Sequence, residues 1–218
     1  PDHVVEQYGA DTLRVYEMFM GPLDASIAWS ENGLESTRRF LDRIWRLYVA
    51  EDGSLSERIQ DAENPALERV YHQTVKKVTE DYEILHFNTA ISQMMIFLNA
   101  TKDQAIIPKA YAQGLIQLLA PLAPHISEEI WQKLGHQDSI SHVAWPSYEE
   151  ALTIEDQVEV VVQINGKIKA KVMVEANMAA DALGDLALNL PEIQAQLEGK
   201  TLRKVVAIPN RLVNIVAN

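Results

Sequence analysis

A histidine followed by two carboxylates is the feature of the sequence that comes nearest to a catalytic motif. The run His125-Ile126-Ser127-Glu128-Glu129 follows the inverted zinc-protease pattern H-x-x-E-H, but Glu129 stands where the second metal-binding histidine is required. The metal interpretation therefore fails. The alternative is the start of a helix, where early carboxylates interact favourably with the helix dipole. The other histidines lack the spacing of metal ligands, and we expect no metal site.

Other catalytic chemistries find little support in the residue types. The sequence contains no cysteine, which excludes thiol nucleophiles, disulfides and thiolate-bound zinc. Its glycines are scattered, and only Asn165-Gly166-Lys167 follows a predicted strand, so no phosphate-binding loop is expected. No spacing singles out a pair of carboxylates for acid–base catalysis. We therefore expect no catalytic residue and no cofactor site in this chain.

Two groups of cationic side chains could instead contact the phosphates of a nucleic acid. One group lies on a single predicted helix, and the other comes from predicted strands and turns near the C-terminus. The members are Arg38, Arg39, Arg43 and Arg46 in the first group, and Lys167, Lys169, Lys171, Lys200, Arg203, Lys204 and Arg211 in the second. Each group can also be explained without nucleic acid. The arginines would form a solvated helix face with local acidic partners. The second group would protect the edge of a sheet by lysine.

The charge is distributed unevenly along the chain. The net charge of −12 argues against wholesale attraction to nucleic acid. Residues 1–150 carry 12 basic and 23 acidic side chains, whereas residues 151–218 carry 7 and 8, so the net charges of the two parts are −11 and −1. The second part is therefore better able to present a local positive surface.

Helical periodicity dominates from Gly9 to about Leu134. Ser30 and Asn64, the latter followed by Pro65, have the residue types that begin helices. The residues at helical spacing that are expected to be buried form these stripes: Leu34, Leu41, Ile44, Trp45, Tyr48; Leu67, Val70, Tyr71, Thr74, Val78, Tyr82; Phe87, Ala90, Ile91, Met94, Leu98; Leu115, Leu118, Leu119, Leu122; and Ile126, Ile130, Trp131, Leu134. Residues 1–152 are therefore predicted to form an all-α helical bundle.

The period changes from 3.6 to 2 beyond a boundary that we place near residue 152. Two strands are predicted around Asn165-Gly166, a helical region over residues 179–198, and two further strands at Leu202–Ile208 and Leu212–Val216. We therefore predict a multi-domain chain in which the helical bundle, residues 1–152, is followed by a small α+β domain, residues 153–218.

The loop of the first hairpin can be predicted from the valine pattern. A two-residue turn would pair Ile164 with Lys167 and place the lysines on the face of the valines. A three-residue loop, residues 164–166, with Gly166 in a left-handed bulge would pair Gln163 with Lys167 and keep Lys167, Lys169 and Lys171 together on the outer face. We therefore predict the bulged loop, with Glu159 opposite Lys171.

Targeting segments are not expected. The sequence contains no run of eighteen apolar residues and no basic segment followed by an apolar stretch at its start, so we predict a soluble, cytoplasmic protein. Because it begins with Pro1 and reads as structured from Asp2 onward, we also expect it to be part of a longer chain.

Several motifs of the first part resemble the class I aminoacyl-tRNA synthetases. Residues 8–14 look like the helix that follows the KMSKS loop of these enzymes, and the loop itself is not among the residues. The entry to their anticodon-binding-type domain is similar to Trp29-Ser30, residues 39–47 and residues 87–91. The most specific likeness is the run from Leu119 to Trp131 with Trp145-Pro146 downstream. This set is typical of the leucyl, isoleucyl and valyl branch.

The second part resembles the C-terminal domain of bacterial leucyl-tRNA synthetases. The similar segments are residues 161–167, 197–205 and 208–216. Valyl enzymes typically end in a coiled coil and many isoleucyl enzymes in a cysteine-rich zinc module, and this sequence has neither. Asn210 stands where that family would have glycine, but asparagine tolerates the same left-handed backbone.

The resemblance implies a parent enzyme that is a leucine-tRNA ligase using ATP and magnesium, with catalysis and editing outside these residues. The fragment alone is expected to be inactive. Its implied partners are tRNA(Leu) and the catalytic domain of the parent, with no membrane and no DNA. The helical domain would follow the inner side of the tRNA without reading the anticodon, and the C-terminal domain would reach the tRNA corner through phosphates and 2′-hydroxyls.

The cations that fit this role are predicted to bind tRNA: Lys167, Lys169, Lys171, Arg203, Lys204, Arg211, Arg39, Arg43 and Arg46. Two alternatives stay open at this point. The chain could be a fragment of a valyl- or isoleucyl-tRNA synthetase, or a helical module that binds another protein.

Overall fold

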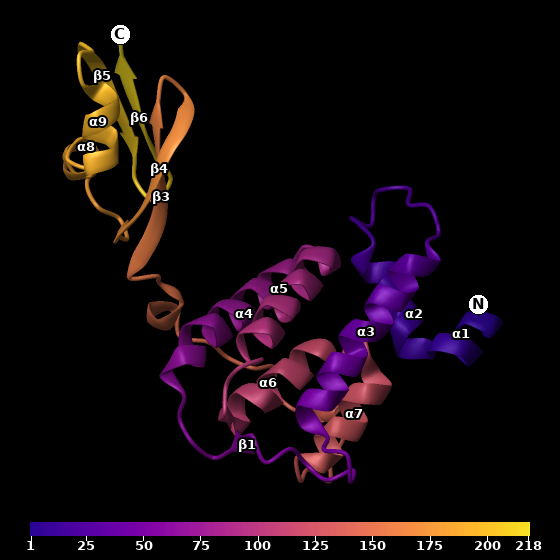
Figure 1. Ribbon diagram of the computed structural model, residues 1–218. Helices are drawn as coiled ribbons and strands as arrows, with labels where there is room; N and C mark the ends of the chain where they lie inside the picture. Colours follow the sequence, from indigo (N-terminus) through magenta and orange to yellow (C-terminus); the bar gives the residue numbers. More distant parts are fainter. The chain divides into compact units, whose positions relative to one another are not determined.

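The chain folds as two compact units, Pro1–Thr153 and Ile154–Asn218, in a computed structural model that describes residues 1–218 (Figure 1). The first unit is built of helices, and the second combines a four-stranded sheet with two helices. The predicted fold class, a helical bundle followed by a small α+β part, is confirmed. None of the helices is both long enough and apolar enough to cross a membrane.

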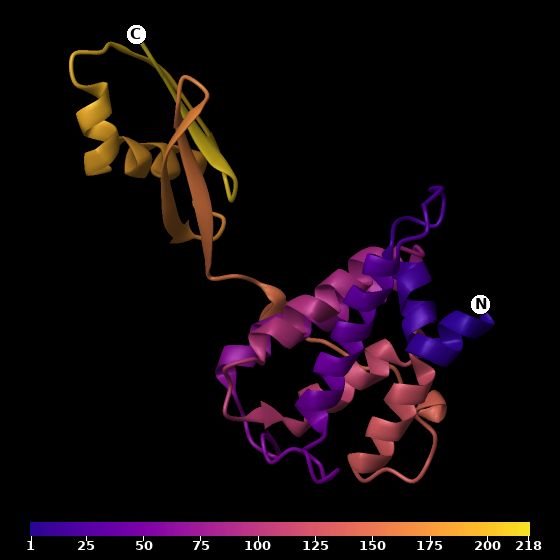
Figure 2. The same cartoon turned by 45° about the vertical axis from the view of Figure 1, so that its right-hand side comes forward.

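Helices make up most of the first unit (Figure 2). They are α1 (Asp2–Tyr8), α2 (Ala10–Phe19), α3 (Glu31–Tyr48), α4 (Pro65–Glu83), α5 (Phe87–Ala100), α6 (Lys109–Leu119) and α7 (Pro124–Lys133), with the 3₁₀ turns η1 (Ile140–His142) and η2 (Glu150–Thr153). Two short segments, β1 (Ile59–Gln60) and β2 (Ile107–Pro108), pair in parallel and were not predicted.

The predicted helix starts are confirmed in atomic detail. The Ser30 hydroxyl accepts a hydrogen bond from the Gly33 amide at 3.2 Å, and the Asn64 side chain accepts one from the Ala66 amide at 3.1 Å. Asn64 also donates through Nδ2 to the Ile106 carbonyl, 2.8 Å away. Its side chain therefore begins α4 and also fixes the chain that leads into β2.

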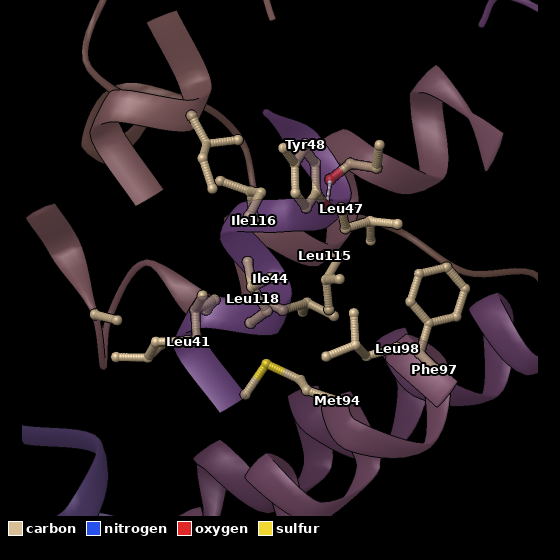
Figure 3. Close-up of a cluster of buried hydrophobic side chains, with 14 of the residues drawn as sticks. Leu41, Ile44, Leu47, Tyr48, Met94, Phe97, Leu98, Leu115, Ile116 and Leu118 are labelled. Atoms are coloured by element: carbon tan, nitrogen blue, oxygen red, sulfur yellow. Dashed lines mark hydrogen bonds between the residues drawn. The ribbon is translucent and has the colours of Figure 1, made fainter. Parts of the chain in front are cut away.

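The core of the first unit includes buried side chains from all the helices α3 to α7, and Figure 3 shows the part of it where α3, α5 and α6 meet. Ile44 of α3, Met94 of α5 and Leu118 of α6 are each 0% exposed and pack in one cluster. Tyr48 extends the cluster, and its buried hydroxyl donates to the Ala112 carbonyl at 2.7 Å. The apolar stripes predicted from helical spacing thus meet in one core, which leaves the polar face of α3 exposed.

The last segment of the first unit, residues 145–153, lies along the polar face of α4. Thr79 accepts from the Trp145 indole Nε1 at 2.8 Å, His72 Nδ1 accepts from the Glu149 amide at 3.1 Å, and Gln73 Nε2 donates to the Thr153 carbonyl at 2.9 Å. Residues 145–153 are therefore held in place, although their sequence shows no period.

Limited proteolysis is expected to cleave the chain just beyond this segment, in the connection between the two units. Glutamyl endopeptidase is expected to cut first after Glu155, which is exposed, and only later after Glu149 and Glu150, whose backbone is held on α4. Mass spectrometry of a time course would identify the fragments 1–155 and 156–218. First cuts within residues 157–175 would contradict the two-unit organisation.

The second unit is a mixed sheet covered on one face by two helices. Its elements are β3 (Gln157–Ile164), β4 (Lys167–Glu175), α8 (Ala180–Leu188), α9 (Pro191–Leu197), β5 (Leu202–Ile208) and β6 (Leu212–Ala217). The strand order is β4-β3-β6-β5, with β3 and β6 parallel and the other pairs antiparallel. Leu183, Ala187 and Ile193 of the helices pack on the buried face of the sheet.

The opposite face of this sheet, here called the open face, carries no helix. Two rows of directly paired residues cross it: Lys171, Val161, Leu212 and Ile208 in one row, and Ile168, Gln163, Asn214 and Val206 in the other. Lys204 lies on the same face opposite Val216. Directly paired residues point to the same side of a sheet, so these side chains share one surface.

The turn of the β3–β4 hairpin differs from the prediction. It is the two-residue turn Asn165-Gly166, with φ of 50° and 78°, and not the three-residue loop. Ile164 pairs with Lys167, and the register then shifts so that Val162 pairs with Ala170. Lys169 is therefore the extra residue of a bulge inside β4. The valine pattern correctly predicted that the register of β3 and β4 is offset by one residue, but the extra residue lies within β4 and not in the loop.

Candidate nucleic-acid interface

The predicted arginines of the helical unit project from the polar face of α3. Arg39, Arg43 and Arg46 are exposed, on the side of the helix opposite the core. Arg43 donates to the Asn99 side-chain oxygen at 2.6 Å, and Arg39 donates to the Ser36 hydroxyl at 2.8 Å and lies 3.7 Å from Glu35. Exposed contacts of this kind are weak and exchange readily. These side chains therefore keep their charge available at the surface.

Arg38 has a structural role on the same helix. Its guanidinium donates to Asp42 at 2.9 Å and to the Tyr8 carbonyl at the end of α1, also at 2.9 Å. A second arginine, Arg14 of α2, donates to the carbonyls of Pro121 and Leu122 at 2.9 and 3.0 Å. Arg38 thus ties α3 to the end of α1, and Arg14 ties α2 to the connection between α6 and α7.

The start of α7 is bound by a carboxylate from α2 that the sequence interpretation missed. Asp11 accepts hydrogen bonds from the amides of His125, at 3.3 Å, and Ile126, at 2.7 Å, and its Oδ1 lies 2.8 Å from His125 Nδ1. The His125–Glu129 run is thus the first turn of a helix, as the non-metal alternative proposed. Its capping residue is 114 positions away in the sequence, so no local pattern could identify it.

Removing this cap should destabilise the helical unit. Asp11→Ala is expected to lower its free energy of unfolding by about 1–2 kcal/mol, because two amides of α7 lose their acceptor. Asp11→Asn keeps one side-chain oxygen and should lose about half as much. Urea titrations followed by tryptophan fluorescence measure both values. Equal stability of Asp11→Ala and the parent would show that the contact contributes nothing.

The prediction that Lys167, Lys169 and Lys171 share one face of the hairpin is wrong. Lys167 pairs with Ile164, a buried residue on the helix-covered side, whereas Lys171 pairs with Val161 on the open face. The bulge at Lys169 causes the change, since a one-residue offset moves a side chain to the other face. Lys171 still reaches Glu159, 2.8 Å away, but diagonally, because Glu159 pairs with Met173.

The remaining predicted cations of the small unit lie at the sheet margins. Arg203, on β5, donates to the Asn218 side chain at 2.7 Å. Lys204 is exposed on the open face, and Arg211 follows the turn at Asn210, which has the predicted left-handed backbone with φ of 59°. Of the six predicted cations here, Lys171 and Lys204 are the two that the strand register places on the open face.

Metal-binding geometry is absent from the chain. No group of three or more histidine or carboxylate side chains comes together in a way that could hold a metal ion. A cavity of about 680 Å³ lies between α1, α2, α3 and the start of α7, and Trp45, Arg38 and Asp11 line it. In its wall, Arg38 is already paired with Asp42, and Asp11 is already paired with His125 at the start of α7.

Comparisons with known proteins point to one family. Residues 65–183 match the family model described as the anticodon-binding domain of tRNA ligase. A solved structure, the ternary complex of Agrobacterium radiobacter K84 agnB2 LeuRS with tRNA and LeuAMS, is similar over 100% of this chain with 30% sequence identity and a TM-score of 0.77. This chain covers 30% of the length of that LeuRS chain.

Proposed function

This chain belongs to the anticodon-binding domain family of tRNA ligases, and on that premise we propose that it is the tRNA-contacting C-terminal part of a leucyl-tRNA synthetase. The observation that carries the proposal is the match, over 100% of this chain, to part of a LeuRS whose structure contains tRNA. The match includes the small α+β unit as well as the helices. That unit is the part of the chain whose motifs separate the leucyl enzymes from the valyl and isoleucyl enzymes.

The proposed role of the chain is binding, and the chemistry belongs to the rest of the enzyme. Leucine, ATP and magnesium would be handled by the catalytic domain of the parent, which would act on tRNA(Leu) in the cytoplasm. The polar face of α3 and the cations of the small unit would hold the tRNA through phosphates, which position an RNA without reading its bases. We assign no residue of this chain to catalysis.

Binding of tRNA by the chain itself tests the proposal. Fluorescence anisotropy with labelled tRNA(Leu) should show binding that weakens steeply with salt, and the slope of log affinity against log salt should be about −0.7 to −0.9 for each phosphate contact. Incubation with leucine, ATP and magnesium should yield no leucyl-tRNA. The proposal fails if tRNA does not bind at low salt, and formation of leucyl-tRNA would refute the assignment of chemistry to the rest of the enzyme.

A further inference from the structure

The two edges of the sheet in the small unit differ. The strand order β4-β3-β6-β5 leaves one free edge on β4 and one on β5. β4 carries Lys167, Lys169 and Lys171 and is bulged at Lys169, and both features hinder the pairing of a further strand. β5 pairs regularly with β6 from Lys204 to Ile208, a stretch with a single cation. The edge of β5 is therefore the one that can accept another strand.

The hydrogen bonds of β6 show which backbone groups of β5 are free. The Ile215 carbonyl accepts from the Asn165 amide at 2.8 Å, so the polar backbone groups of Ile215 point towards β3. Successive residues of a strand alternate in this direction, so those of Val213 point the same way. The residues of β5 opposite Ile215 and Val213 are Val205 and Ala207. Their N–H and C=O groups therefore point away from β6, towards the free edge.

A groove of about 550 Å³ runs along this edge, between β5 and α8. Val205 and Ala207 line it from the helix-covered face of the sheet and Val206 from the open face, so the groove includes the edge itself. Its floor is where the two elements meet: a Cβ on Gly184 would lie 3.3 Å from Val205 Cγ1. Leu188 extends this floor. The groove thus offers an apolar floor beside free main-chain groups.

The side of the groove formed by α8 is negatively charged. Asp181 and Asp185 line it and are exposed, and residues 176–199, which contain both helices, carry four carboxylates and no cation. Lys204 also lines the groove, but it pairs with Val216 and so lies on the open face. A segment in the groove would therefore meet carboxylates on its helix side, where they favour cations.

The spacing of the two carboxylates matches that of a strand. Residues 180–188 of α8 border the groove along its length, and Asp181 and Asp185 are separated by about 6 Å along the helix axis. Alternate side chains of a strand are about 6.6–6.8 Å apart. Two alternate lysines or arginines can thus each reach one carboxylate, with their methylene groups over the apolar floor. The positions between them would lie beside Val206 and Ile208, which are 36% and 40% exposed, and suit apolar residues.

We propose that the edge of β5 binds a basic, extended segment of another protein, which adds a fifth strand to the sheet. Main-chain hydrogen bonds to Val205 and Ala207 hold the segment, and Asp181 and Asp185 select cations at alternate positions. An RNA would be repelled by the same carboxylates. The inference goes beyond the proposed function and does not depend on tRNA binding, because the groove uses carboxylates and backbone groups.

A short blocked peptide of alternating lysine and valine is the probe for this site. Added to the isotope-labelled full chain, it should shift the amide resonances of Val205 and Ala207 and slow their exchange with solvent. The amide of Val206, which points towards β6, should keep its exchange rate. A peptide of the same composition with its lysines and valines in two blocks should bind at least about tenfold more weakly, because its cations cannot alternate along a strand.

Variants of the full chain separate the main-chain contacts from the charges. Val205→Pro removes an outward N–H and should weaken binding of the alternating peptide at least about tenfold, whereas Val205→Ala keeps the N–H and should stay within about threefold of the parent. Asp181→Asn with Asp185→Asn should weaken binding about three- to tenfold. Glu192→Gln with Glu198→Gln makes the same change in net charge on exposed positions of α9 and should have no effect.

The outcomes distinguish this site from simple charge attraction. Equal binding of the two peptides, or equal effects of the α8 and α9 variants, would overturn the inference, because only net charge would then matter. Circular dichroism and melting check each variant, and if Val205→Pro does not fold, the carboxylate variants and the two amide resonances decide. Protection of these amides by tRNA and not by the peptide would also overturn the inference. A dimer in sedimentation that Val205→Pro abolishes, without peptide binding, would assign the edge to a second copy of the chain.

Discussion

Leu118→Ala is expected to lower the free energy of unfolding of the helical unit by about 3–5 kcal/mol, the range for a leucine removed from a core that cannot collapse around the gap. Leu118 is 0% exposed and lies among Leu41, Ile44 and Met94 (Figure 3). Its own carbonyl accepts from the Tyr82 hydroxyl at 2.8 Å, which ties α6 to α4 and limits relaxation of the helix. Alanine would therefore leave a cavity between three helices.

The tryptophans make this loss measurable for the helical unit alone. All four tryptophans, Trp29, Trp45, Trp131 and Trp145, lie in residues 1–153, so fluorescence in a urea titration reports that unit. Leu23→Ala is the matched control, because Leu23 is 53% exposed and its truncation should cost less than about 0.5 kcal/mol. Equal losses in the two variants would contradict a core centred on α3, α5 and α6.

Local rules predict much of this fold from the sequence. The caps at Ser30 and Asn64, the apolar stripes, and the change of period before Gln157 each depend on residues within one or two turns of each other, and the structure confirms the elements they predict. Pro191 marks the division of the 179–198 helical region into α8 and α9. Such features follow from backbone hydrogen bonding and side-chain period, which the sequence displays directly.

Contacts between distant residues could not be predicted in the same way. Asp11 caps α7 across 114 residues, and the parallel pairing of β3 with β6 joins segments about fifty residues apart. The hairpin register shows a subtler limit. The valine pattern required one extra residue on the second strand side of the hairpin, which could lie either in the loop or in the strand. In the structure it lies in the strand, as the bulge at Lys169. That choice decided which predicted lysines reach the open face.

Alkaline pH is expected to destabilise the helical unit through its buried tyrosines. Burial raises the pKa of Tyr71 to about 12 and also raises the pKa of Tyr82 and of Tyr48, with the neighbouring Tyr71 adding to the shift of Tyr48. An unfolded tyrosine loses its proton near pH 10. Between pH 10 and 12 the unfolded chain therefore releases protons that the folded chain keeps.

The sign and size of the effect follow from this difference. Stability is fully present below the ordinary pKa near 10 and is lost as the pH rises towards the folded pKa, by about 1.4 kcal/mol per pH unit for each tyrosine. Tyr71 alone should cost about 2–3 kcal/mol by pH 12. With three such residues against a typical domain stability of 5–15 kcal/mol, the unit should unfold without denaturant near the upper end of this window.

Single phenylalanine variants separate the tyrosines from the lysines, which titrate in the same range. Tyr71→Phe has no proton to lose, so its free energy of unfolding should fall less steeply between pH 10 and 12, by about 1.4 kcal/mol per unit, in urea titrations read by tryptophan fluorescence. Tyr48→Phe should behave alike in slope but start from a lower stability at pH 7, since it loses the 2.7 Å hydrogen bond to the Ala112 carbonyl. If both variants kept the slope of the parent, the tyrosines would not control the alkaline transition.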